Sequence, residues 1–332
     1  MKGLLLPLLA LLSAPAIGQT IAITGGKLVI GDGSPPIEGG TVVLNNGRVV
    51  ASGRNVTVPA GAQRIDATGK WVTPGIVAGF SRIGLAGVDA VDEANDTSAK
   101  TTPYSAALDI ALAINPDVEA IAVNRAAGVT RAVVSPEAGA AIFAGQGVVI
   151  DTGTDPEPVT KAEAFQFVEF GEGGSQRAGG SRPALVAAFR DALSETHDYQ
   201  TGHLRADSRL KRTDAAALVP VLTGAEKLIV HAESAADILA VLSLKRDYPA
   251  LNLVLVGVTE GWRVASQIAA SGVPVIASAV NDLPAAFEQI AATQSNVGRM
   301  KAAGITVAIG MIDDDDTRQA MHAAQYAETL SP

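Results

Sequence analysis

The sequence contains no cysteine among its 332 residues. This excludes disulfide bonds, a thiol nucleophile and a lipid attached to an N-terminal cysteine. Basic residues are also few, with 25 Lys and Arg against 34 Asp and Glu, so the net charge is -9. No dense basic patch is present to meet nucleic-acid phosphates, and no glycine-rich phosphate loop stands between a strand and a helix. We therefore expect no nucleic acid as a partner.

The N-terminus has the pattern of a secretory signal. Lys2 precedes an apolar run over residues 4–12, and the small residues Ala16 and Gly18 suit cleavage before Gln19. The run is too short to span a bilayer, although a retained membrane anchor is the alternative. We expect residues 1–18 to be a signal peptide and the protein to be periplasmic or secreted, without a stable membrane anchor.

Residues 19–70 are predicted to form a small β domain. Short β-branched runs at 21–23, 27–30, 41–44 and 48–51 alternate with glycine-rich turns. Asn46-Gly47 lies between two of these runs and indicates a hairpin. Helical periodicity is missing from the whole stretch.

Residues 71–332 are predicted to form a TIM-like (β/α)8 barrel, which makes the fold class α/β. Short apolar runs at 227–230, 251–256, 274–277 and 306–309 alternate with helical spacing at 234–244, 262–271 and 283–292. This alternation is typical of parallel strands joined by helices. Helices are also expected at 105–114 and 182–194, and a mobile loop at 171–180. Functional groups of such a barrel lie at the C-terminal ends of its strands.

Three stretches resemble the amidohydrolase superfamily, in particular its imidazolonepropionase-like branch. They are TPGIV at 73–77 followed by AGFSRIG at 78–84, the segment 115–130, and FAGQG at 143–147. The resemblance implies a barrel flanked by a small β-sandwich and a metal-bound hydroxide that attacks a carbonyl carbon. It also implies two metal-binding histidines at the end of the first strand, where this chain has Phe80 and Arg82. The closing β segment of the family is expected to be absent here.

His231 follows directly on an apolar strand and matches the family's metal-binding histidine at the end of the fifth strand. We predict it as a metal ligand; the alternative is a histidine hydrogen-bonded in the barrel mouth without metal, because zinc usually has three or four ligands. The sixth strand is followed by Gly257, so the histidine expected there is missing as well. The cofactor is therefore expected to be a single divalent metal, most readily zinc, or none.

Asp313 follows the eighth strand and is the candidate general base, displaced by one residue from the family's aspartate. Its alternative role is to complement the N-terminal dipole of a following helix. Gln146 and Arg82 are the candidate substrate-binding residues, although the glycines around Gln146 also suit a tight turn.

The residues leave three hypotheses open for function. The first is a secreted amidohydrolase-type enzyme that hydrolyses a C–N bond in a cyclic amide or a peptide-like small molecule, with an incomplete metal site. The second is a non-catalytic member that binds a ligand or a partner, either as a homo-oligomer or with an intact amidohydrolase paralogue. The third is a truncated or decaying gene product.

Overall fold

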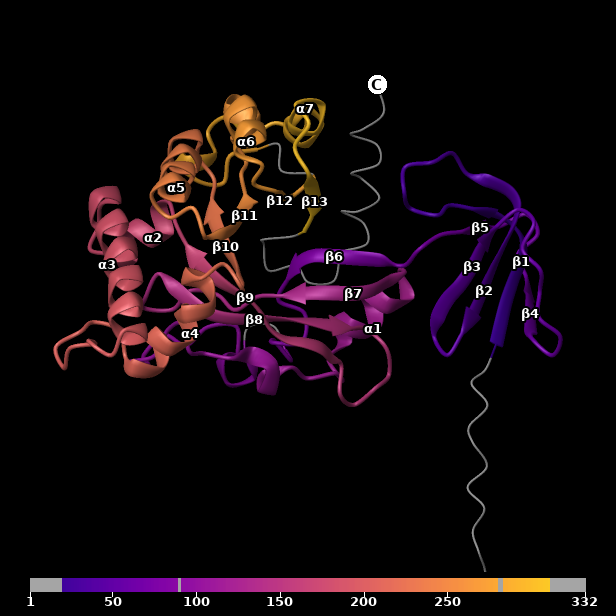
Figure 1. Ribbon diagram of the computed structural model, residues 1–332, viewed down its shortest axis with the longest axis horizontal. Coiled ribbons are helices and arrows are strands. Elements are labelled where there is room, and N and C mark those ends of the chain that lie inside the picture. The colour runs from indigo at the N-terminus through magenta and orange to yellow at the C-terminus, as the bar shows by residue number, and fades with distance from the viewer. Residues whose placement is uncertain (1–19, 89–90, 280–282, 311–332) are drawn as a thin grey trace, which may run out of the picture. The chain divides into compact units, whose positions relative to one another are not determined.

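The computed structural model describes residues 20–88, 91–279 and 283–310 (Figure 1). Within them the chain forms two compact units that divide between Pro74 and Gly75. None of the described helices is both long and apolar enough to cross a membrane. The predicted signal peptide lies outside the described residues.

The first unit contains a five-stranded sheet. Its strands are β1 (Thr20–Leu28), β2 (Ile37–Asn45), β3 (Arg48–Gly53), β4 (Gln63–Asp66) and β5 (Trp71–Val72). They follow the order β3-β2-β1-β4, with β5 also beside β1. Asn46 and Gly47 both have positive φ, 50° and 71°, as a two-residue hairpin turn requires, which confirms the predicted hairpin. A sandwich needs a second sheet, and the described strands of this unit all belong to one.

The second unit is built on an eight-stranded sheet that curves into a nearly closed barrel. The strands follow the chain order from β6 to β13. They are β6 (Ile76–Ser81), β7 (Val129–Val134), β8 (Phe143–Asp151), β9 (Val159–Glu169), β10 (Lys227–Ala232), β11 (Asn252–Gly257), β12 (Val275–Ala277) and β13 (Val307–Ile309). The two end strands approach each other closely, because a Cβ atom on Gly79 would lie 2.5 Å from the carbonyl oxygen of Ile309.

One strand departs from the parallel barrel that the sequence predicts. β8 pairs antiparallel with both β7 and β9, whereas β6 and β7, and all the pairs from β9 to β13, are parallel. Short segments connect β8 to its neighbours, and a parallel crossover needs about a dozen residues or more. The chain therefore turns back on itself at β8.

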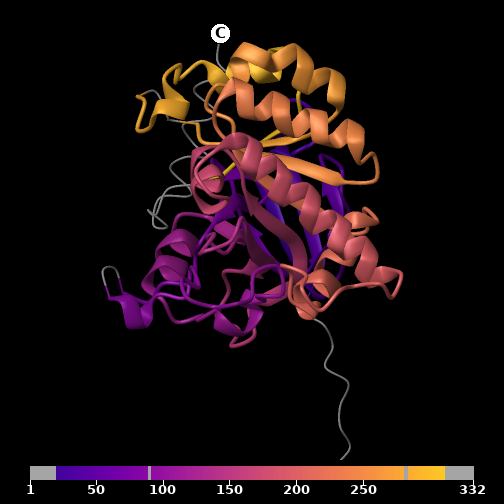
Figure 2. The ribbon, with the colours of Figure 1, turned by 90° about the vertical axis from the view of Figure 1, so that its left-hand side faces the viewer.

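Helices cover the outside of the sheet (Figures 1 and 2). They are α1 (Glu119–Ala126), α2 (Glu172–Arg177), α3 (Arg182–Gln200), α4 (Arg212–Leu222), α5 (Ala235–Asp247), α6 (Ala265–Ser271) and α7 (Asn296–Ala302), with the 3₁₀ turns η1 (Asp92–Ala94), η2 (Ile110–Ala113), η3 (Gly261–Val264) and η4 (Phe287–Gln289). Side chains alternate along the strands: Leu228 and Val230 pack in the outer core, while Ile229 belongs to the cluster inside the barrel.

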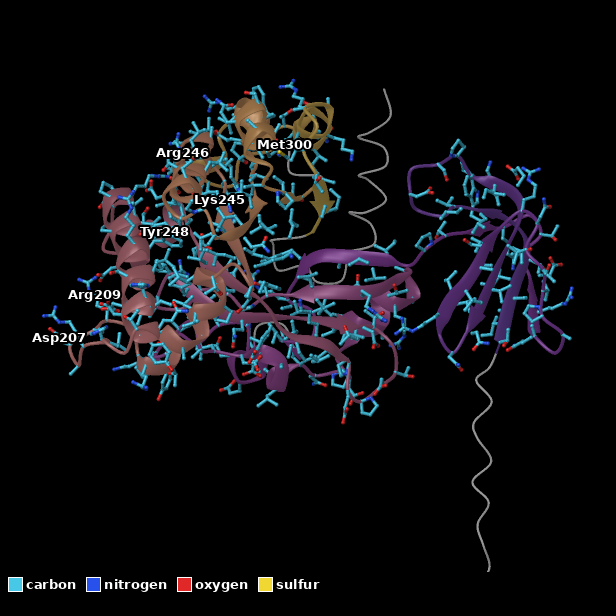
Figure 3. All side chains as sticks on the ribbon, viewed as in Figure 1. Asp207, Arg209, Lys245, Arg246, Tyr248 and Met300 are labelled. Carbon is cyan, nitrogen blue, oxygen red and sulfur yellow. The ribbon has the colours of Figure 1, made fainter. Side chains whose placement is uncertain are left out.

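Three local predictions differ from the structure. The helices expected at 105–114 and 283–292 are reduced to the short turns η2 and η4, whereas α2 occupies part of the expected loop at 171–180. Most of the basic run at 205–212 lies on the loop before α4, where Asp207 and Arg209 are labelled in Figure 3.

Candidate active site

A histidine held between two glutamates lies at the C-terminal ends of β9 and β10. His231 Nδ1 is 2.8 Å from Oε1 of Glu169, and His231 Nε2 is 3.0 Å from Oε1 of Glu233. The side chains of His231 and Glu169 are each 14% exposed, and that of Glu233 is 4% exposed. Solvent therefore reaches this group at His231 and Glu169 rather than at Glu233.

Strand alternation explains why His231 and Glu169 meet. Phe167 of β9 and Ile229 of β10 belong to the cluster inside the barrel, so the residues two positions further along each strand point to the same side. Those residues are Glu169 and His231, which are direct partners in the parallel pairing of the two strands. The sequence thus places both side chains at the barrel mouth.

Glu233 is fixed from the neighbouring loop. Its Oε2 accepts the Thr259 N–H at 2.9 Å, and its carbonyl oxygen accepts the Glu260 N–H at 3.0 Å. Gly257, with φ at 92°, stands beside it: a Cβ atom there would lie 2.6 Å from Oε1 of Glu233 and 2.9 Å from Cδ2 of His231. The end of β11 is therefore shaped around the histidine and its buried glutamate.

The charges in this group stabilise one another. Burial acts to lower the pKa of His231, but the charges of Glu169 and Glu233, with hydrogen bonds to both, hold that pKa well above its ordinary value of 6.5. Burial likewise acts to raise the pKa of Glu233, while the hydrogen bond and charge of His231 and the Thr259 N–H hold it below its ordinary value. His231 and Glu233 therefore each favour the charged form of the other.

Further charged groups surround this one. Glu288 on η4 accepts the Glu172 N–H at 2.8 Å, and burial raises the pKa of its carboxyl. Arg182 donates to both carboxylate oxygens of Asp237, at 2.6 and 2.8 Å, where α3 and α5 begin. These contacts fix the loops that follow β9, β10 and β12.

Phe80 occupies the interior of the barrel. It is fully buried in β6 and packs in the same cluster as Phe165, Phe167 and Ile229. Arg82 comes directly after β6 and is half-buried, at the same end of the barrel as His231. The structure therefore brings Arg82 to the barrel mouth, while Phe80 contributes apolar packing.

A conventional zinc site does not fit these residues. Zinc needs three or four ligands with free lone pairs, and both ring nitrogens of His231 face carboxylates. Within residues 20–88, 91–279 and 283–310, no group of three or more His, Asp or Glu is placed to hold a metal ion. No chemical step is therefore assigned to a metal here.

Gln146, another predicted site residue, lies apart from this group. Gln146 is buried in the middle of β8, where it pairs with Gln166 of β9. Gln166 donates its side-chain amide to the Ala106 carbonyl, which lies on the segment covering that part of the sheet. Asp313 lies outside the described residues. The roles of both stay predictions.

Sequence reasoning missed Glu169 and Glu233. Glu169 ends an apolar run in which every second side chain points into the barrel. This alternation is the signal that could have identified it. Glu233 comes two residues after His231 and lies just beyond the end of β10. The regular geometry of the strand therefore does not by itself bring its carboxylate to the ring. Its contact depends on the turn after β11, which the sequence does not reveal.

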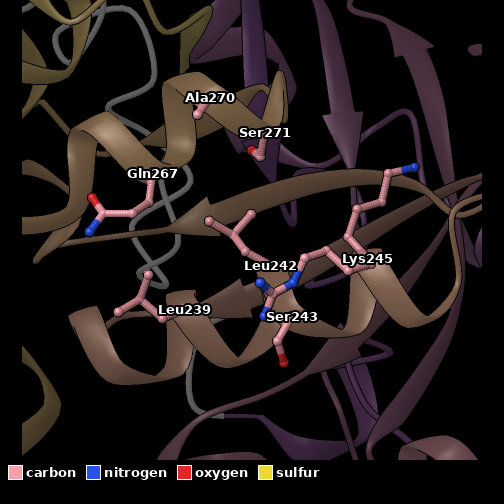
Figure 4. Close-up of a pocket in the computed structure, with 8 residues that line it drawn as sticks. Leu239, Leu242, Ser243, Lys245, Gln267, Ala270 and Ser271 are labelled. Carbon is pink, nitrogen blue, oxygen red and sulfur yellow. The ribbon is translucent and has the colours of Figure 1, made fainter.

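A hollow of about 430 Å³ lies on the outer side of the barrel, between α5 and α6 (Figure 4). Leu239, Leu242 and Ala270 line it, together with the basic Lys245 and Arg246. The ammonium group of Lys245 donates to the carbonyls of Pro249 and Leu251, so it ties the last turn of α5 to the loop that leads into β11. No carboxylate lines this hollow, and we place the candidate active site at the barrel mouth instead.

Comparison with solved structures identifies the architecture. An amidohydrolase from Thermotoga maritima MSB8 matches with a TM-score of 0.81 and 24% sequence identity, over 93% of this chain and 83% of that chain. The chain has the fold of that amidohydrolase. Weaker matches include a beta-aspartyl dipeptidase from Fervidobacterium islandicum AW-1 (TM-score 0.48, 12% identity, covering 95% and 83% of the two chains) and a triazine hydrolase from Arthobacter aurescens (0.43, 14%, 90% and 73%). No family model and no curated protein sequence matches.

Proposed function

We propose that this protein is a hydrolase of the amidohydrolase superfamily, in its imidazolonepropionase-like branch, acting on a C–N bond of a small amide. The observation that carries the proposal is the group Glu169–His231–Glu233 at the C-terminal ends of barrel strands, where enzymes of this architecture hold their reacting groups. The fold shared with the Thermotoga amidohydrolase supports the superfamily.

In this proposal Glu169 is the general base. It is the more exposed of the two glutamates that flank His231, and a carboxylate can take a proton from an attacking water. The water oxygen then adds to the carbonyl carbon, the C–N bond breaks, and the amine nitrogen leaves with the proton that Glu169 took from the water. Arg82, at the same end of the barrel, is proposed to contact the substrate. The sequence pattern at residues 1–18 supports a periplasmic or secreted enzyme.

A panel of cyclic amides and dipeptides tests this proposal, with amine release as the measurement. Glu169→Gln is expected to lower turnover by about a hundred-fold or more, the usual contribution of a general base. Glu157→Gln, on an exposed loop, is the matched control and is expected to retain activity. Equal turnover in the wild type and Glu169→Gln would refute the role of Glu169.

The packing of Phe80 favours a second candidate, a non-catalytic binding protein. A fully buried phenyl ring fills barrel space beside the mouth, where a metal site would have to be built. Such a protein would bind the small amide or an intact paralogue without turnover. Saturable binding of a panel compound that stays chemically unchanged would support this candidate over the hydrolase.

A further inference from the structure

We infer that His231 is a doubly donating imidazolium rather than a metal ligand, and that Glu233 is the residue that positions it. This inference rests on the proposed function only for the use made of Glu169. The state of the ring itself is measured without any substrate.

The donor and acceptor roles follow from the two contacts of the ring. Each nitrogen of His231 faces a glutamate oxygen at hydrogen-bond distance, 2.8 Å to Glu169 and 3.0 Å to Glu233. A carboxylate only accepts hydrogen bonds, so two carboxylates at these distances call for a proton on each ring nitrogen. A ring with two N–H groups has no lone pair left for a metal.

Glu233 is held more firmly than Glu169. Its side chain is 4% exposed against 14% for Glu169, and Thr259 and His231 each bind one of its carboxylate oxygens. The Thr259 N–H is presented by a turn in which Val258 has φ at 48°, a conformation that a β-branched residue rarely adopts. The carbonyl of Val258 accepts the side-chain amide of Asn296, which holds this turn from α7.

The wall of the barrel at β11 excludes a second histidine beside the first. A side chain at position 257 would collide with Glu233 and with His231, so the glycine belongs to the arrangement. At β6 the corresponding space is filled by the apolar ring of Phe80. At the ends of β6 and β11, where further metal ligands would have to stand, the chain thus has residues that pack around a charged histidine.

For the proposed reaction, this arrangement has a defined consequence. The imidazolium donates to Oε1 of Glu169 and so fixes the orientation of that carboxylate at the mouth. Glu233 acts on Glu169 through His231, because it sets the position and the charge of the ring.

Nitrogen-15 NMR of the histidine side chains tests the inference on protein without a histidine tag. The His231 signals are assigned by their loss in His231→Gln. We expect both ring nitrogens to carry protons from pH 6 to pH 8. A neutral ring at pH 7 would overturn the inference.

Glu233→Gln tests the positioning role with nearly unchanged size. We expect the apparent pKa of His231 to fall by about one pH unit or more, since one carboxylate charge and its hydrogen bond are lost. An unchanged pKa would contradict the role of Glu233; if the variant does not fold, the wild-type ring signals still decide the state of His231.

Zinc titration with mass spectrometry supplies the second measurement. We expect that His231→Gln, compared with the wild type and with the exposed-site control His197→Gln, does not lose an equivalent of bound zinc. Loss of an equivalent of zinc in His231→Gln alone would overturn the inference. A failure to find any hydrolysed amide would count against the proposed function alone, because neither measurement involves turnover.

Discussion

Phe80 of β6 packs against Phe167 of β9 inside the barrel, with ring centroids 5.6 Å apart and planes tilted by 47°. The pair joins two strands that are separated by β7 and β8 in the sheet. The interior at this level is therefore an apolar core, and the polar group begins above it with Glu169 and His231.

Phe80→Ala is expected to destabilise the protein by about 3 to 5 kcal/mol, because it removes a fully buried ring and leaves a cavity. Phe287→Ala is the matched control, since Phe287 is 84% exposed, and its effect is expected to stay within about 0.5 kcal/mol. Urea denaturation measures both. Similar losses for the two variants would show that Phe80 does not contribute to the core as described.

His231→Gln is expected to cost about 3 to 5 kcal/mol, because it leaves two carboxylates close together without the charge between them. His197→Gln, on the exposed surface of α3, is expected to change the free energy of unfolding little. Adding Glu233→Gln to His231→Gln should recover part of the loss, since it removes one uncompensated charge. No recovery in the double variant would argue against the charge explanation.

The contribution of His231 to stability is expected to depend on pH in a defined direction. Its folded pKa is raised above 6.5, so the folded state holds the proton more tightly than the unfolded chain. The contribution is complete below about pH 6.5 and is lost as the pH rises through the folded pKa. The difference in unfolding free energy between wild type and His231→Gln should therefore narrow from pH 6 to pH 9. If this free-energy difference instead widens with rising pH, the pKa of His231 is not raised in the folded state.

Gly257→Ala is expected to cost more than Gly272→Ala, although both glycines have positive φ, 92° and 66°. At position 257 the new methyl group meets Glu233 and His231, whereas at 272 there is nothing within 4 Å. We expect about 1 to 2 kcal/mol for the backbone alone at 272 and a larger loss at 257. Equal losses would show that the contact with the two side chains does not matter.

Glu226 gives a prediction independent of the candidate site. Burial, and then the charge of Glu163, raise the pKa of Glu226 to about 7. Its cost to stability appears as the pH rises above 4.5, where the unfolded chain ionises first. Glu226→Gln should therefore stabilise the protein at pH 8 by about 1 to 3 kcal/mol and have less effect at pH 5. Denaturation at the two pH values checks this, with Glu157→Gln as control.

The barrel was predictable from the sequence where strands are short, apolar and β-branched. The run at 227–230 and its helix at 234–244 became β10 and α5, with His231 on the fifth strand of the sheet as predicted. Each of these segments carries its own periodicity. Local pattern was therefore sufficient for this half of the barrel.

The direction of β8 was not predictable in the same way. Its apolar residues fit either strand direction, and the choice depends on the length of the connections to β7 and β9. The helix expected at 283–292 failed for a related reason: Phe287 and Ile290 are exposed, so the apolar spacing there does not face a core.

The candidate site shows the same division. His231 was found from its position after a strand, whereas its two partners come from a neighbouring strand and a loop. Glu233 reaches the ring only because Gly257 leaves space and Thr259 donates its N–H. Contacts of this kind depend on three segments at once, and spacing within one segment does not encode them.

The close approach of Gly79 and Ile309 has a consequence for biosynthesis. The first and last strands of the barrel meet there, so the ring of strands cannot close before β13 has been made. Until then β12 presents an unpaired edge, and such edges are the parts of a sheet most prone to join another chain. Release of the nascent chain before β13 is therefore expected to favour aggregation, and folding of the barrel is expected to be slow because its final contact spans nearly the whole unit.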